Sequence, residues 1–148
     1  MKYTTVFLDL DDTLIDTEGN TKRCMQEIYK DHHINQYYPT FDEFFTVYHA
    51  STTELWKNYA KGIIDKPTLQ KTRFKKPFQA FPDVTQNYLD NMSVDFLGRM
   101  VLMDTQIEGA EELLDYLQDK YKIVMISNGF SEMQYKKMES AGLTKYFD

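Results

Sequence analysis

The sequence predicts an α/β protein in which a parallel sheet is interrupted by a long helical insertion. Two short apolar runs, residues 4–9 and 122–127, are typical of buried strands, and polar residues end each of them abruptly. Neither run alternates with polar residues, which is expected for strands covered on both faces in a parallel sheet. Residues 17–105, which lie between the runs, show helical rather than strand periodicity.

The insertion is expected to consist of several helices. Thr40 and Glu43 have the spacing of a capping box, which marks the start of a helix. Large apolar side chains then recur at helical spacing, at Phe41, Phe44, Phe45, Tyr48, Leu55, Trp56 and Tyr59. Further helices are predicted at about 20–32, 66–76 and 84–103, and prolines punctuate them at Pro39, Pro67, Pro77 and Pro82. The pattern predicts a helical unit that follows the first strand.

Two more helices are expected to flank the second strand. The first has an apolar face at Leu113, Leu114 and Leu117 and acidic residues in its first turn, which suit the helix dipole. The second is predicted around Met138, and Gly142 is expected to end it. A succession of helix, strand, loop and helix is typical of an α/β sheet.

The composition limits the partners of the protein. The formal net charge is −6 and no run of Lys or Arg exceeds two residues, so free nucleic acid is not an expected partner. A small phosphorylated metabolite is compatible with this charge, because backbone donors and a metal ion can bind phosphate on an acidic protein. The single cysteine, Cys24, is expected to be a packed, reduced thiol. No segment approaches membrane-spanning length and the first residues are unlike a secretory signal, so we expect a cytoplasmic protein without a membrane partner.

Three carboxylates, Asp9, Asp11 and Asp12, follow the first strand directly. Their crowding at the carboxyl end of a buried strand is costly unless a cation compensates it, and oxygen-only ligands favour Mg²⁺. The spacing lets Asp9 and Asp11 face one pocket, where one attacks phosphorus while the other protonates the departing oxygen and later activates water. Thr13 is placed to orient Asp9. A solvated acidic turn is the plain alternative, whereas an EF-hand loop would need glycine where Leu14 stands.

The segment from Phe7 to Leu14 resembles the first motif, DxDxT, of the haloacid dehalogenase (HAD) superfamily. In that family the first Asp forms the phosphoaspartate, and the second is the acid/base. Mg²⁺ is held by the first carboxylate and by the backbone carbonyl of the second Asp, so these roles fall on Asp9 and Asp11. The second family motif is a strand-ending hydroxyl whose following amides bind phosphate, and Ser127 matches it.

The phosphate site that the resemblance implies comprises Thr13, Ser127, Asn128 and Gly129. Asn128 and Gly129 fit a tight turn with exposed N–H groups. On its own, a serine at the end of a strand is an ordinary feature. Ser127 is a candidate phosphate ligand because it follows an apolar run and stands two residues before a glycine.

The fold implied by the resemblance is a HAD-like, Rossmann-like parallel sheet with an inserted α-helical cap. It divides the chain into an α/β core, residues 1–16 and 105–148, and a cap, residues 17–104. Within the cap, Trp56 and Tyr59 are candidates for a platform that stacks on a substrate base. The alternative is that both rings belong to the core of the cap.

The function implied by the resemblance is Mg²⁺-dependent hydrolysis of phosphomonoesters through phospho-Asp9. The carboxylate at Asp11 favours phosphoryl transfer, because the dehalogenase branch of the family lacks a carboxylate there. Residues 55–64 and 69–74 resemble the helical cap of HAD-type pyrimidine 5′-nucleotidases, which predicts a nucleotide as the phosphorylated substrate. Arg73 is expected to be a surface or structural cation.

The later motifs of the family, a phosphate-neutralising lysine and further metal-binding aspartates, find no match before Asp148. Lys136, Lys137 and Lys145 lie nearby but carry no assignment. We therefore expect the chain to be the N-terminal portion of a longer protein or a truncated product, and to hydrolyse phosphate esters poorly alone. Strand exchange in a homodimer is another way to cover an exposed sheet edge. A sugar-phosphate mutase of the same superfamily and an inactive module with a binding role are the alternative functions.

Overall fold

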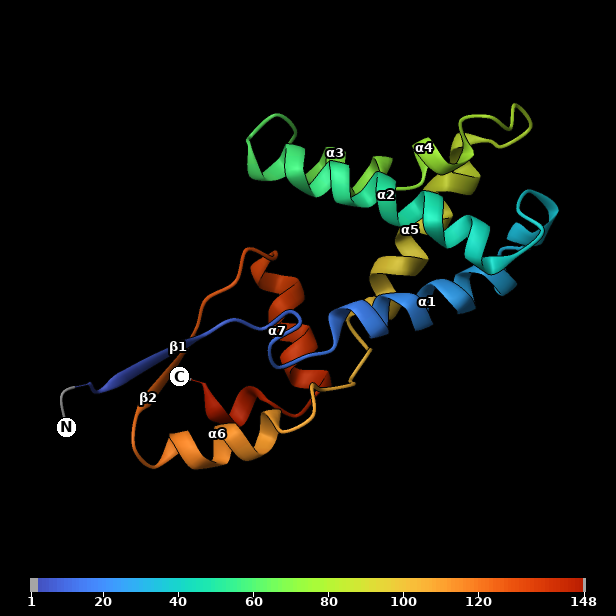
Figure 1. Ribbon diagram of the computed structural model, residues 1–148. Coiled ribbons are helices and arrows are strands. Elements are labelled where there is room, and N and C mark those ends of the chain that lie inside the picture. Colours follow the sequence, from blue (N-terminus) through green and yellow to red (C-terminus); the bar gives the residue numbers. More distant parts are fainter. Residues whose placement is uncertain (1–2, 148) are drawn as a thin grey trace. The chain divides into compact units, whose positions relative to one another are not determined.

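The computed structural model describes residues 3–147, and the chain divides into two compact units (Figure 1). One unit contains Met1–Arg23 and Arg99–Asp148, and the other contains Cys24–Gly98. The two boundaries between the units fall inside helices α1, Thr17–Asp31, and α5, Gln86–Met100. The functional division into a core and a cap stays a prediction, because compactness by itself does not test it.

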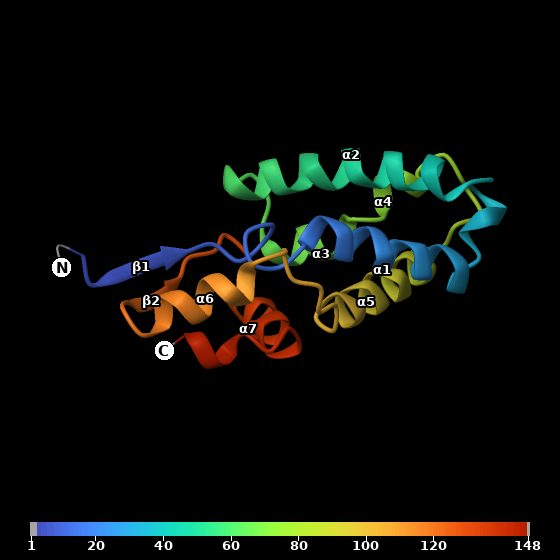
Figure 2. The same cartoon turned by 60° about the horizontal axis from the view of Figure 1, so that its bottom comes forward.

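The first unit contains a pair of parallel strands, which confirms the predicted α/β class. β1, Thr5–Leu8, pairs with β2, Lys122–Met125, in a register that places Thr5 opposite Lys122. The two strands lie side by side in Figures 1 and 2, although most of the chain separates them in sequence. Parallel neighbours need such a long connection, and here the connection contains the whole second unit.

Helices complete the first unit. α6, Ala110–Gln118, runs beside β2, and α7, Ser131–Ser140, follows it in the chain. The short 3₁₀ helix η2, Thr144–Tyr146, contacts both α6 and α7. The core of this unit unites buried side chains from both halves of the sequence: Leu10, Leu14, Ile15, Ala110, Leu114, Leu117, Ile123, Met138, Leu143 and Tyr146. Full burial of one such leucine stabilises the fold by about 1.5–3 kcal/mol.

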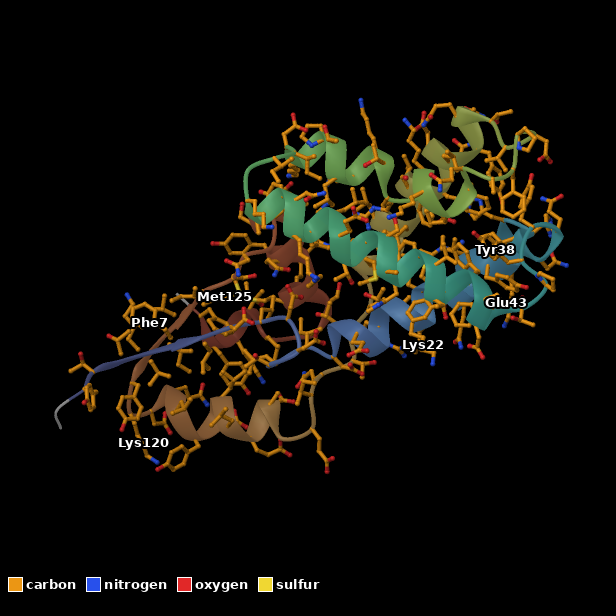
Figure 3. All side chains as sticks on the ribbon, turned by 45° about the horizontal axis from the view of Figure 1, so that its top comes forward. Phe7, Lys22, Tyr38, Glu43, Lys120 and Met125 are labelled. Atoms are coloured by element: carbon orange, nitrogen blue, oxygen red, sulfur yellow. The ribbon has the colours of Figure 1, made fainter. Side chains whose placement is uncertain are left out.

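The two faces of the strand pair differ. Val6 and Ile123 lie opposite each other and pack onto the core, and Met125 joins them on the same face. Phe7, labelled in Figure 3, belongs to the other face and is 59% exposed, and Ile126 beyond β2 is 56% exposed. The expectation that both faces are covered is therefore wrong for residues 3–147, because no described element buries the Phe7 side.

The end of α7 agrees with the prediction from Gly142. This glycine has a φ of +70°, which glycine adopts without steric strain because it has no side chain. Its N–H donates to the Glu139 carbonyl, and the Leu143 N–H donates to the Met138 carbonyl. Met138 and Leu143 are both buried in the core. This is the Schellman arrangement, in which a hydrophobic contact accompanies the reversal of the chain.

The second unit is helical, as predicted. α1, Thr17–Asp31, continues into it and is followed by the 3₁₀ helix η1, Ile34–Gln36, and by α2, Phe41–Ala60. The predicted capping box is present: Thr40 accepts from the Glu43 N–H, and Glu43 accepts from the Thr40 N–H. The α2 helix therefore begins where the sequence indicated.

The remaining helices of this unit differ in detail from the prediction. The segment expected as one helix at 66–76 forms α3, Lys66–Thr72, and α4, Lys75–Phe78, both of which lie beside α2 (Figure 1). Pro77 has no N–H to donate to the carbonyl four residues earlier, which favours the break. α5, Gln86–Met100, is shorter than predicted.

Aromatic rings fill the centre of the second unit. The Tyr48 and Phe74 rings stack at 5.4 Å between centroids, and Phe96 lies edge-on to both. Arg73 is buried, and its guanidinium lies 4.5 Å from the centre of the Phe96 ring. Arg73 is thus the structural cation that the sequence suggested. Among residues 3–147, no helix is long and apolar enough to cross a membrane.

Candidate active site

The loop after β1 is built around the backbone of Leu10. The Leu10 side chain is fully buried, and its carbonyl accepts from the Leu14 and Ile15 N–H groups, each at 3.0 Å. Asp12 takes a left-handed conformation with φ 55° and donates its N–H to the Ile15 carbonyl at 2.8 Å. This tight reversal holds Asp11 half-buried at the end of the strand, beside the start of α1.

Asp11 is the centre of a polar network. Its Oδ1 accepts from Thr17 Oγ1 and from Lys137 Nζ, each at 2.6 Å, and its Oδ2 accepts from Gln134 Nε2 at 2.6 Å. Thr17 begins α1, whereas Gln134 and Lys137 lie one turn apart on α7. The carboxylate therefore ties two helices of the first unit to the loop after β1.

The surroundings of Asp11 favour its ionised form. Burial would raise the pKa of this carboxyl, but the nearby charge of Lys137 opposes it, as do the hydrogen bonds from Lys137, Thr17 and Gln134. Together they hold the pKa of Asp11 below its ordinary value. The Lys137 side chain is only 10% exposed, so its ammonium is largely shielded from water and directed at Asp11.

Ser127, at the end of β2, belongs to the same network. Its Oγ accepts from Gln134 Nε2 at 2.5 Å and from the Gly129 N–H at 3.0 Å. A Cβ at Gly129 would lie 2.4 Å from Gln134 Nε2, so only glycine leaves room for the amide there. The candidate acid/base and the candidate phosphate-binding hydroxyl are thus joined by one side chain, because adjacent parallel strands end at the same edge.

Other candidate residues lie at the surface of the first unit. Asp9, Thr13 and Asn128 are exposed, so their polar groups are accessible to a ligand. The Asp12 carboxylate has a structural contact instead, since it accepts from the Glu18 N–H at 2.8 Å in the first turn of α1.

Trp56 and Tyr59 lie near the end of α2 in the second unit. Their rings meet edge to face, with centroids 5.8 Å apart. Trp56 is 37% exposed, so it is not part of the buried centre of that unit. The role of Trp56 and Tyr59 in substrate binding stays a prediction.

The carboxylates do not form a ready-made metal cage. Within residues 3–147, no group of three or more His, Cys, Asp or Glu side chains is arranged to hold a metal ion. The exposed carboxylate of Asp9 is nevertheless the hard oxygen ligand that Mg²⁺ prefers, and Mg²⁺ commonly takes only one or two protein carboxylates. The donor set therefore fits a magnesium ion that keeps several water ligands.

Gln134 and Lys137 were not selected from the sequence. Both are buried on the inner face of α7 together with Met138, although polar residues at such positions look like a solvated surface. Their separation of three residues places them on one side of the helix, directly after the Ser127 turn. That spacing, combined with the acidic loop after β1, is the signal that could have identified them.

The strand pair, with a helical insertion after its first strand, defines an α/β protein with an inserted helical unit. The chain belongs to the haloacid dehalogenase-like hydrolases, since the sequence model of that family matches residues 3–148. Pyrimidine 5′-nucleotidase YjjG of Escherichia coli is 31% identical over all of this chain and 61% of its own length. The human N-acylneuraminate-9-phosphatase is 26% identical over 97% of this chain and 58% of its own length.

A solved structure shares the fold. The HAD-hydrolase YfnB of Bacillus subtilis, crystallised with bound magnesium, superposes with a TM-score of 0.86 at 22% identity. The match covers all of this chain and 64% of YfnB. The chain thus spans about 60% of the length of the curated relatives it matches. The match to the family model confirms the predicted family, and the superposition on YfnB confirms the HAD-like fold.

Proposed function

We propose that the protein is a Mg²⁺-dependent phosphomonoester hydrolase that works through a phospho-Asp9 intermediate. The observation that carries this proposal is the hydrogen-bonded link from Asp11 through Gln134 to Ser127. It brings together, at one edge of the strand pair, the acid/base and the phosphate-binding hydroxyl that the reaction needs. Asp9, two residues before Asp11, is exposed and accessible to a substrate.

The reaction has two steps. Asp11 first takes up a proton from solvent. The Asp9 carboxylate attacks phosphorus, the bond from phosphorus to the ester oxygen breaks, and the protonated Asp11 transfers its proton to the departing oxygen. Asp11 then removes a proton from water, which attacks the phosphoaspartate and releases phosphate. Between the two steps the phosphoryl group is bound by the Ser127 hydroxyl, the Thr13 hydroxyl and the exposed Asn128 turn. The Gly129 N–H supports Ser127, to which it already donates.

A magnesium ion would be held by the Asp9 carboxylate and by the backbone carbonyl of Asp11. When bound, it would offset the negative charge of the carboxylate and the phosphate as they approach. The Asp11 carboxylate oxygens accept from Thr17, Lys137 and Gln134, so the backbone carbonyl of Asp11 rather than its side chain is proposed as the ligand.

The substrate that we propose is a nucleoside 5′-monophosphate. Two relatives, YjjG and PynA of Streptococcus pneumoniae, are named pyrimidine 5′-nucleotidases. The exposed indole of Trp56, with the Tyr59 ring against it, provides an aromatic surface on which a base can stack. The N-acylneuraminate-9-phosphatase relatives support the phosphomonoester class more broadly than they support a nucleotide.

Asp9→Asn tests the proposed chemistry. The protein is expressed from the longest open reading frame that contains this sequence, and phosphate release from nucleoside monophosphates is measured with Mg²⁺. We expect Asp9→Asn to abolish both phosphate release and acid-stable labelling of the protein. Asp12→Asn is the matched control, because the Asp12 side chain accepts from the Glu18 N–H of α1 and an asparagine oxygen can do the same, so this variant should retain both. Turnover that survives in Asp9→Asn would refute the proposal, and a product that keeps its phosphoryl group would indicate a mutase.

A further inference from the structure

The Ser127 hydroxyl has both of its acceptor positions filled. Gln134 Nε2 donates to Ser127 Oγ at 2.5 Å, and the Gly129 N–H donates to the same oxygen at 3.0 Å. A serine hydroxyl has two acceptor lone pairs and a single hydrogen to donate. With both lone pairs engaged, the hydrogen must point away from Gln134 and from Gly129.

Asp11 fixes the orientation of the Gln134 amide. A carboxylate only accepts hydrogen bonds, so the Gln134 atom that lies 2.6 Å from Asp11 Oδ2 must be the amide nitrogen. One hydrogen of this nitrogen then serves Asp11 and the other serves Ser127. Gln134 is 1% exposed, so water does not compete for these two hydrogen bonds.

The backbone around Ser127 preserves this arrangement. Gly129 has no side chain, and a Cβ in its place would lie 2.6 Å from the carbon of the Gln134 amide group. Such a contact would push the amide away from Ser127. Glycine at position 129 therefore keeps the Gln134 amide in its place beside Ser127.

We propose that Gln134 is a positioning residue of the phosphate site, which holds the Ser127 hydroxyl so that its hydrogen is donated to a phosphate oxygen. This inference rests on the proposed function and adds a residue to it. A phosphate oxygen is an acceptor only, so a hydroxyl whose lone pairs are already engaged meets it in the required orientation. Without Gln134, the hydroxyl rotates among its staggered positions, and phosphate binding must stop that rotation.

Binding of inorganic phosphate tests the proposal, in the protein expressed from the longest open reading frame that contains this sequence. Calorimetry with Mg²⁺ compares Gln134→Met, Ser127→Ala and the double variant. We expect Gln134→Met to weaken phosphate binding about threefold to tenfold. Ser127→Ala should weaken it about tenfold or more, because it removes a hydrogen bond to a charged group. In the Ser127→Ala background, Gln134→Met should have no further effect.

The matched control is Gln106→Met. Gln106 also donates from its side-chain nitrogen, at 2.9 Å to the Ala141 carbonyl, but it does not contact Ser127. We expect this variant to leave phosphate binding unchanged. Gln134→Glu provides a second variant that keeps the volume of the side chain. Its carboxylate cannot donate to Ser127 and places a second negative charge beside Asp11, so phosphate should bind more weakly than to Gln134→Met.

The outcomes separate this inference from the proposed function. If Ser127→Ala binds phosphate as tightly as the parent, the proposed phosphate site is wrong, and the inference fails with it. If Ser127→Ala weakens binding but both Gln134 variants bind like the parent, only the positioning role is overturned. An equal loss from Gln134→Met with and without the Ser127 hydroxyl would also overturn it, because Gln134 would then act independently of Ser127.

Discussion

Replacing Lys137 by methionine is expected to destabilise the protein through the charge of Asp11. Methionine keeps most of the apolar stem of lysine and removes the ammonium. Removing one partner of a fully buried ion pair costs about 3–5 kcal/mol. The Asp11 side chain is 30% exposed and keeps the hydrogen bonds from Thr17 and Gln134, so the expected loss in the free energy of unfolding is smaller, about 2 kcal/mol. In a chain of this length, that lowers Tm by about 4–8 °C.

Thermal and urea unfolding at neutral pH measure this loss, and Lys136→Met is the control because Lys136 is exposed. The pKa of Asp11 is lowered in the folded state. The Asp11–Lys137 pair therefore makes its full contribution to the free energy of unfolding above the ordinary aspartate pKa. It disappears as the pH falls through the folded-state pKa, since a protonated Asp11 needs no cation. Equal losses in Lys136→Met and Lys137→Met, or additive effects of Lys137→Met and Asp11→Asn, would refute the reasoning.

Three further predictions concern capping, glycine and tyrosine. Thr40→Ala removes the capping box of α2 and should cost about 1 kcal/mol in urea unfolding; an unchanged midpoint would contradict it. Gly129→Ala should lower the melting temperature because its Cβ would meet the Gln134 amide, whereas Gly98→Ala, with nothing within 4 Å, should stabilise α5 by about 0.5–1 kcal/mol. The same sign in both glycine variants would exclude this explanation. Burial raises the pKa of Tyr88 to about 12, so its contribution to stability should be complete below pH 10, its unfolded-state value, and disappear as the pH rises through 12. Tyrosinate absorbance checks this, and full ionisation of all tyrosines near pH 10 would contradict it.

Local signals in the sequence were sufficient to predict most of the elements. The capping box at Thr40, the end of α7 at Gly142 and the two apolar strand runs depend on neighbouring residues alone. The parallel pairing was predicted from two runs that lack polar alternation, as expected for strands covered on both faces, and the pairing is correct although the Phe7 face is exposed in residues 3–147. The prediction of a single helix at 66–76 was wrong, because the segment forms two helices. The missing N–H of Pro77 favours this break, although the apolar pattern around it is helical.

The candidate site was predictable only in part. Asp9, Asp11 and Ser127 occupy strand ends, and strand ends can be read from apolar runs followed by polar residues. Gln134 and Lys137 were missed because a hydropathy pattern assigns polar residues of a helix to the solvent. Only the fold brings them to a carboxylate more than a hundred residues away in the sequence.

The sequence by itself determined the strands, the helices and the family, because these depend on short-range chemistry and on motifs of adjacent residues. The tertiary structure decided which polar side chains are buried and which partners satisfy them. The pairing of β1 with β2 brings the Asp11 loop and the Ser127 turn to one edge, and α7 then places Gln134 between them. The direction of a hydroxyl hydrogen and the charge on a carboxylate depend on those distances, and no local pattern contains them.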